Sequence, residues 1–154
     1  MGELFITYRL KDNKIDYKVR SFDEITEKEK VVYLNCVNND LTVLDLSHCP
    51  LLRDLHCSGN KLTVLDLSHC PLLKYLNCYD NQLTVLDLSH CPLIKYLGCS
   101  DNILTVMDLS HCPLLEYLNC KNNRLTVLDL SHCHYPVMII GYNKAIIKQN
   151  KKIF

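Results

Sequence analysis

The sequence lacks the features that mark several large classes of protein. No stretch approaches the roughly 18 consecutive apolar residues that a membrane-spanning helix needs. The start, MGELFITYRL, has neither the basic residues nor the apolar run of a secretory signal. Acidic and basic residues balance at 17 each, whereas a dedicated nucleic-acid binder usually carries a strongly basic face. We therefore expect a soluble cytoplasmic protein that binds neither membrane nor nucleic acid.

The chain also lacks the short motifs by which many enzymes and metalloproteins are identified. It contains no glycine-rich phosphate loop, no Gly-x-Ser-x-Gly, no His-x-x-x-His and no Cys-x-x-Cys. Each of these motifs fixes the spacing of groups that must act together on a phosphate, an acyl group or a metal. The sequence therefore favours a protein that is not an enzyme and that needs no cofactor.

Cysteine, in contrast, is abundant and strictly spaced. The ten cysteines alternate in steps of 13 and 8 residues, and they fall into two columns of a 21-residue repeat. The first column is Cys36, Cys57, Cys78, Cys99 and Cys120, and the second is Cys49, Cys70, Cys91, Cys112 and Cys133. Pairing within a column of five would leave one thiol over, so we interpret the cysteines as reduced core residues rather than as a disulfide framework.

The repeat itself predicts a solenoid. The phrase LTVLDLSHCP begins at Leu41 and returns with small changes every 21 residues, and the whole repeat reads L-x-x-L-x-C-x-x-N-x-L-x-x-L-D-L-S-H-C-P-x. Each coil contains two similar halves, and the L-x-C and L-x-L triplets alternate inward and outward as in a strand. We expect a mainly β solenoid of about five coils, each with two short parallel strands, for example at 54–57 and 64–67.

The ends depart from the repeat, which divides the chain into three parts. Residues 1–30 are predicted to form a cap, with a hairpin of strands 4–10 and 15–19 followed by a short helix from Ser21 to about Lys30. Residues 31–147 form the solenoid. Its last half-coil, VMIIGYNK, has Gly141 in place of Cys and Lys144 in place of Asn. Residues 148–154 form a basic tail.

These residues carry a resemblance to a known family. The pattern from about Tyr33 to Lys144 resembles the leucine-rich repeat family, in particular its 21-residue nested class, sometimes called IRREKO. The resemblance implies a rigid surface for protein binding, because members of the family mostly act in that way. It names no partner.

Three polar columns have competing interpretations. The Asn column is expected to be structural, since a buried amide can satisfy backbone groups at a turn. The His and Asp columns suggest an alternative function, a metal-binding or redox-sensing solenoid that would also use the cysteines. However, neighbouring residues of an extended chain point to opposite sides, so each His should face outward while its Cys faces inward. We therefore predict no metal site.

The members of the three columns lie 21 residues apart. The Asn column is Asn39, Asn60, Asn81, Asn102 and Asn123. The His column is His48, His69, His90, His111 and His132, and the Asp column is Asp45, Asp66, Asp87, Asp108 and Asp129.

The candidate binding site lies on the first strand of each coil, where the outward residues vary between copies. Tyrosine dominates one column and hydrogen-bonding residues dominate the next, and Tyr is enriched among the anchors of protein interfaces. The alternative is an aromatic ladder that only stabilises the sheet. We predict that this face binds another protein. The predicted partner-binding residues are Tyr33, Asn35, Asp54, His56, Tyr75, Asn77, Tyr96, Tyr117 and Asn119.

Overall fold

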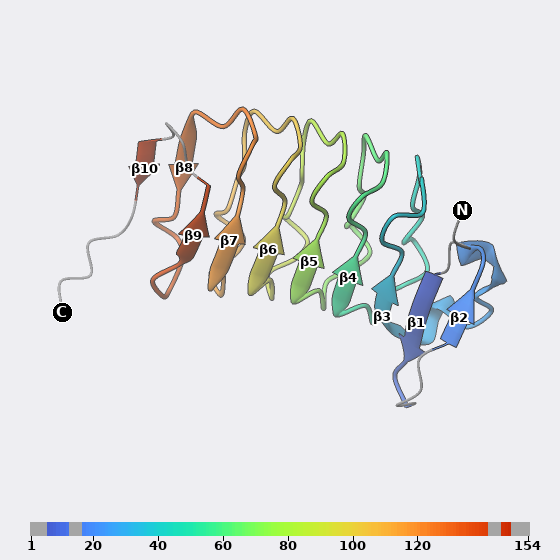
Figure 1. Cartoon of the computed structure of the whole chain (residues 1–154). Helices are drawn as coiled ribbons and strands as arrows, with labels where there is room; N and C mark the ends of the chain where they lie inside the picture. Colours follow the sequence, from blue (N-terminus) through green and yellow to red (C-terminus); the bar gives the residue numbers. More distant parts are fainter. Residues whose placement is uncertain (1–5, 13–16, 142–145, 149–154) are drawn as a thin grey trace.

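The computed structural model describes residues 6–12, 17–141 and 146–148, and these residues form a solenoid (Figure 1). The predicted repeat architecture is confirmed: the chain is mainly β, with about five coils at a spacing of about 21 residues. The strands are β1 (Ile6–Leu10), β2 (Tyr17–Val19), β3 (Val31–Asn35), β4 (Asp54–His56), β5 (Tyr75–Asn77), β6 (Tyr96–Gly98), β7 (Tyr117–Asn119), β8 (Val127–Asp129), β9 (Met138–Ile140) and β10 (Ile146–Lys148).

One long sheet runs along the solenoid, in the order β2-β1-β3-β4-β5-β6-β7-β9. From β3 to β9 its strands are parallel, and equivalent residues of successive coils pair directly, so that Leu55 lies beside Leu76 and Leu76 beside Leu97. This register follows from the repeat, since a shift by one residue would turn every buried leucine toward solvent.

The core fills the interior of the coils. Leu55 and Cys57 are fully buried, whereas Asp54 and His56 on the opposite side of the same strand are only half-buried. Leu62, Leu67 and their equivalents close the core from the other wall. A stack of such coils buries a continuous apolar column that no single coil could bury alone.

A tight turn follows each of the strands β3 to β7, and its geometry restricts the residue type at one position of the repeat. Its residues have positive φ angles between 53° and 64°, a conformation that Gly, Asn and Asp adopt at the lowest cost. They are Asn38, Gly59, Asp80, Asp101 and Asn122. The position therefore holds only Asn, Gly or Asp in the five coils, because these residue types share the ability to adopt a positive φ.

The second wall differs from the prediction of a second strand in every coil. Within the described residues the strands of this wall are β8 and β10 alone, which pair in parallel. The predicted inward and outward alternation is present, with Leu65 and Leu67 buried. However, Ser68 N–H donates to the Asp66 carboxylate and Cys70 N–H to the Leu67 carbonyl. The coil of β8 makes the same two bonds, from Ser131 N–H and Cys133 N–H, and differs in that Leu130 N–H also donates to the Lys148 carbonyl beside it.

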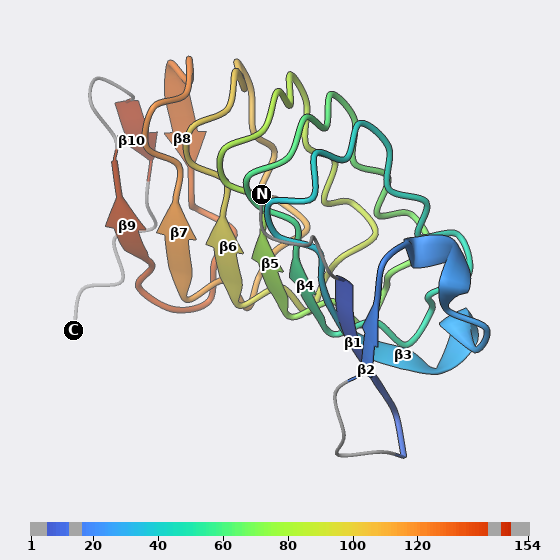
Figure 2. The ribbon, with the colours of Figure 1, turned by 45° about the vertical axis from the view of Figure 1, so that its right-hand side comes forward.

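At the N-terminal end, β1 pairs antiparallel with both β2 and β3 (Figure 2). The predicted helix up to Lys30 is replaced by two single 3₁₀ turns, η1 (Phe22–Glu24) and η2 (Lys28–Lys30). The side chain of Ser21 accepts a hydrogen bond from Asp23 N–H, and the backbone becomes extended at Ile25. Ile25 is buried in the core, which explains why the chain leaves the helical path there.

At the C-terminal end, β9 continues the sheet in the register of the repeat, with Met138 beside Tyr117. Gly141, which takes the place of cysteine, has a φ of 84° and lies directly against Lys121, so a side chain would not fit. Lys144, expected in place of the column asparagine, lies outside the described residues. No helix in the described part of the chain is long and apolar enough to cross a membrane.

Candidate functional site

The residues predicted to bind a partner come together on the outward side of β3 to β7, and we call this surface the tyrosine face. Its rows run along the solenoid because equivalent positions pair directly: Tyr75 lies beside Tyr96, and Tyr96 lies beside Tyr117. Their side chains are half-buried against each other. The face therefore consists of ordered rows rather than of separate side chains.

The tyrosine rings are stacked nearly parallel. The ring centroids of Tyr75 and Tyr96 are 4.2 Å apart with an interplanar angle of 5°, and those of Tyr96 and Tyr117 are 4.4 Å apart at 3°. The rings are stacked face to face. The aromatic ladder that the sequence analysis gave as the alternative to a binding surface is therefore formed by these tyrosines. Burial is the main cause that raises the pKa of the Tyr96 hydroxyl.

One coil lacks a tyrosine, and a neighbouring side chain fills its place. Asp54 occupies the tyrosine position of β4, and the imidazole of His56 leans into the stack from the next row. Its centroid lies 4.7 Å from that of Tyr75 and 5.4 Å from that of Tyr33. Burial lowers the pKa of His56, and the charge of Asp54 opposes this shift. At the N-terminal end of the stack, the guanidinium of Arg9 lies over the ring of Tyr33, 5.3 Å from its centroid.

The row beside the tyrosines carries amides. Asn35 and Asn119 each accept a hydrogen bond from the backbone N–H two residues further on, at 3.1 and 3.2 Å. At Gly98 the row has no side chain, but the space is occupied, since an added Cβ would lie 2.9 Å from Oδ1 of Asn77. Two of the three amides in this row, Asn35 and Asn119, are therefore held by the backbone.

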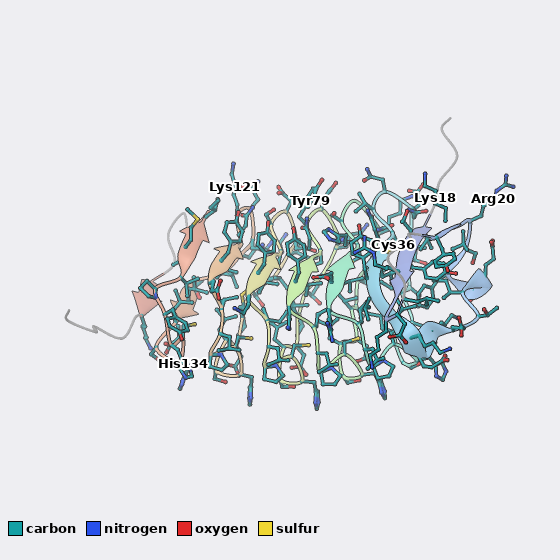
Figure 3. All side chains as sticks on the ribbon, turned by 90° about the horizontal axis from the view of Figure 1, so that it is seen from below. Lys18, Arg20, Cys36, Tyr79, Lys121 and His134 are labelled. Atoms are coloured by element: carbon teal, nitrogen blue, oxygen red, sulfur yellow. The ribbon has the colours of Figure 1, made fainter. Side chains whose placement is uncertain are left out.

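Charged residues border both sides of the tyrosine face, which the sequence interpretation had not identified. The exposed residues Arg53, Lys74 and Lys95 precede β4, β5 and β6, and the last of them forms an ion pair of 2.8 Å with Glu116. Asp80 and Asp101 lie exposed after β5 and β6. Figure 3 shows Tyr79 and Lys121 projecting outward on this second border. Reading the sequence at period 21 around position 53 would have revealed the basic border.

The Asn column forms a ladder inside the turns. Nδ2 of Asn81 donates to the carbonyls of Cys57, Cys78 and Tyr79, and its Oδ1 accepts from Leu62 N–H at 3.0 Å. Asn60, Asn102 and Asn123 make equivalent bonds to the coils before them. Asn39, in the first coil, donates to the Val37 carbonyl. From the second coil on, each amide therefore links its own turn to the coil before it.

All ten cysteines are free and buried. Burial raises the pKa of each thiol, to about 12 for Cys36, Cys70, Cys78 and Cys112 and to about 11 for Cys49 and Cys91. Within the second column, Sγ of Cys91 lies 3.7 Å from the Cys70 carbonyl. Since the thiolate is the reactive form and the form that binds metals, these thiols have neither the charge nor the exposure that such chemistry needs.

The His and Asp columns lie on the outside of the second wall, away from the thiols. His69 is exposed while the adjacent Cys70 is buried, and the other coils repeat this arrangement. At Asp87 the N–H of Ser89 donates to the carboxylate at 2.9 Å, and this bond is the main cause that lowers the pKa of Asp87. In the described part of the chain, no three His, Cys, Asp or Glu side chains converge as a metal site would require.

The second wall also exposes a row of valines, which the sequence interpretation did not include in any site. Val43, Val64, Val85 and Val106 are 68–74% exposed. Val64 and Val85 line a shallow groove together with Asp66, Asp87 and His90. This wall is regular from coil to coil, whereas the tyrosine face varies.

Comparisons with known proteins agree with this geometry. Family models of the leucine-rich repeat match residues 37–55, 61–81 and 82–105. The structure is similar to the functional domain of InlJ from Listeria monocytogenes, which includes a cysteine ladder; the TM-score is 0.66, the sequence identity is 40%, and the match covers 68% of this chain and 23% of that one. It is also similar to a leucine-rich repeat protein of Leptospira interrogans, with a TM-score of 0.60, an identity of 26%, and coverage of 63% and 27%. No curated protein matches the chain.

The chain is thus a leucine-rich repeat protein. It spans about a quarter of the length of the solved structures that it matches. Its assignment to the 21-residue nested class stays a prediction from the sequence.

Proposed function

We propose that this protein is a non-enzymatic scaffold that binds another protein through the tyrosine face. The observation that carries the proposal is the stack of Tyr75, Tyr96 and Tyr117, with ring centroids 4.2 and 4.4 Å apart, on the open side of a continuous sheet. The leucine-rich repeat fold is consistent with such a role. The proposed location is the cytoplasm, where ten free thiols are ordinary.

The fixed geometry of the face favours binding. An interface loses about 0.5–1.5 kcal/mol for each rotamer-rich side chain that it immobilises. Here the tyrosines are already held by stacking and Asn35 and Asn119 by backbone hydrogen bonds. A partner would therefore meet a surface that is ordered in advance, with aromatic edges beside amides that can exchange hydrogen bonds.

The charged borders suggest the orientation of the partner. Arg53, Lys74 and Lys95 lie where the strands begin, and Asp80 and Asp101 lie where they end. Over the coils of β4 and β5, a partner with acidic residues at the first border and basic residues at the second would be favoured in this orientation, because the opposite one brings like charges together.

The metal-binding or redox-sensing alternative is less well supported by the geometry. It requires histidines and thiols to act together, whereas His69 is exposed and Cys70 is buried. Raised thiol pKa values, about 11 or 12 at six of the cysteines, also make the reactive thiolate rare near neutral pH. We therefore retain protein binding as the proposal.

The test is capture of partners from a lysate of the source organism with the immobilised protein. We expect the double variant Tyr75→Asp, Tyr96→Asp to lose partners that the unchanged protein retains. Aspartate already stands at this position of β4, so the coil can accommodate it. The matched control is Val64→Asp, Val85→Asp, which places the same charges on the exposed second wall.

The outcomes are distinct. Loss of the same partners from the tyrosine variant alone would support the proposal, provided that circular dichroism and thermal melting show both variants folded. If the tyrosine variant keeps every partner while the valine variant loses them, the second wall is the binding surface and the proposal is wrong.

A further inference from the structure

The two ends of the long sheet differ in charge. At one end, β2 and the residue that follows it present the exposed charged side chains Lys18 and Arg20 (Figure 3). At the other end lies β9, and the segment 135–141 around it, YPVMIIG, has no charged residue. Soluble proteins usually protect a sheet edge with charges or proline within the strand. Only the first of these two edges carries charge.

One residue of β9, Ile139, has its backbone N–H and C=O directed to the open edge of the sheet. Met138 N–H donates to the Glu116 carbonyl at 2.9 Å, and the Ile140 carbonyl accepts from Cys120 N–H at 3.1 Å. Backbone groups of successive strand residues point to opposite edges, so the N–H and C=O of Ile139 point away from β7. Among the described residues, no strand pairs with this edge.

The side chains of β9 are apolar on both sides of the sheet. Met138 and Ile140 are 65% and 41% exposed, at positions where β7 carries Tyr117 and Asn119. On the core side Ile139 is only partly buried, whereas the equivalent Leu118 is fully buried. The apolar core therefore reaches the surface at this end of the sheet.

We propose that two copies of this chain pair through β9, antiparallel, about a two-fold axis at Ile139. In an antiparallel pair, two directly opposite residues can exchange both N–H···O=C bonds, and Ile139 has both groups pointing outward. Met138 of each copy then lies beside Ile140 of the other copy.

A second copy fits this edge better than an unrelated strand for two reasons. The sequence Met138-Ile139-Ile140 is close to self-complementary in size and polarity about its centre, as a two-fold contact requires. The contact also brings no like charges together, because residues 135–141 are uncharged. The half-buried Ile139 and Val137 of each copy cover those of the other.

The proposed dimer has a consequence for binding. A two-fold axis perpendicular to the sheet leaves both tyrosine faces on the same side of one continuous sheet. Two linked sites bind a partner that is itself repeated more tightly than one site does. The dimer does not depend on the proposed binding function, since its test needs no partner.

The test is sedimentation equilibrium of the full chain over a concentration series. We expect a dimer for the unchanged protein and a monomer for Met138→Lys, Ile140→Lys, which brings four lysines together at the contact. The matched control is Tyr117→Lys, Asn119→Lys, which places the same charges one strand inward, and we expect it to dimerise. An unchanged protein that is monomeric at about 100 μM, or a β9 variant that remains dimeric, would overturn the proposal.

A second measurement keeps the test independent of any misfolding of the variant. Hydrogen exchange of the unchanged protein should show the Ile139 amide protected at high concentration, with the protection lost on dilution. The Met138 amide, which bonds to Glu116 within the same chain, should stay protected throughout. An Ile139 amide that exchanges at one rate at all concentrations would exclude pairing through β9.

Discussion

At the scale of single residues, the repeat is held by an asparagine that no other residue type could replace fully. The two amide hydrogens of Asn81 are shared among three carbonyls and its Oδ1 accepts one hydrogen bond, and these bonds join its own turn to the coil before it. A short side chain with both a donor and an acceptor is required, and the site is buried. This explains why the column contains asparagine in every full coil.

We expect Asn81→Ala to lower the free energy of unfolding by roughly 1–3 kcal/mol, because it leaves buried backbone groups unpaired. The measurement is equilibrium unfolding in urea, with Gln82→Ala as the control, since Gln82 is the exposed neighbour in the same turn. Equal effects of the two substitutions would show that the amide ladder does not stabilise the turn.

Residue alternation was the most reliable information in the sequence. It predicted correctly that Cys57 faces inward, and it separated each His from the adjacent Cys, because both follow from the geometry of an extended chain. It could not show that Ser89 N–H would bond to the Asp87 carboxylate. That bond depends on the local turn, which alternation does not describe.

At the scale of the strand, the tyrosine stack is continuous except at β4. There the coil has Asp54 in the tyrosine row, and His56 restores contact between Tyr33 and Tyr75 at longer centroid distances of 5.4 and 4.7 Å. The tilt of 51° and 31° at these contacts contrasts with the nearly parallel tyrosine pairs. The coil of β4 is therefore the weakest part of the ladder.

The double variant Asp54→Tyr, His56→Asn should strengthen this part, since it gives β4 the residues of β5 and β7. Stacked aromatic pairs contribute about 0.5–1.5 kcal/mol each beyond the area that they bury. We expect a higher midpoint of thermal unfolding by differential scanning calorimetry. His56→Asn alone should lower the midpoint, because it removes the bridging ring. An increase in the single variant would contradict the role assigned to His56.

The sequence predicted the first strand of each coil but not the second wall. Both walls have alternating buried leucines, and the pattern alone predicts strands in both. On the second wall, however, the bond from Cys70 N–H to the Leu67 carbonyl stays within the coil, and the coil of β8 adds to the equivalent bond one from Leu130 N–H to the Lys148 carbonyl of its neighbour. Apolar alternation reports which side is buried, and it does not report where the backbone hydrogen bonds go.

At the scale of the whole molecule, the period of 21 residues was sufficient to predict the solenoid. The ends were less predictable because they occur once and depart from the repeat. The predicted helix after Ser21 became two 3₁₀ turns, since burial of Ile25 takes the chain off the helical path. The tyrosine face was predicted by its variation between coils, and its basic border could have been found at the same period, but the distances and angles of the ring stack became visible only in the structure.

The central claim is that the His, Cys and Asp columns build the solenoid, and that its function lies on the tyrosine face. The most direct test is native mass spectrometry of protein purified without added metal, combined with a count of reactive thiols before and after unfolding. We predict the mass of the metal-free chain, no rapid thiol reaction at pH 8 in the folded protein, and ten reactive thiols after unfolding, as expected for buried, reduced cysteines. Stoichiometric metal, or fewer than ten thiols after unfolding, would contradict the claim.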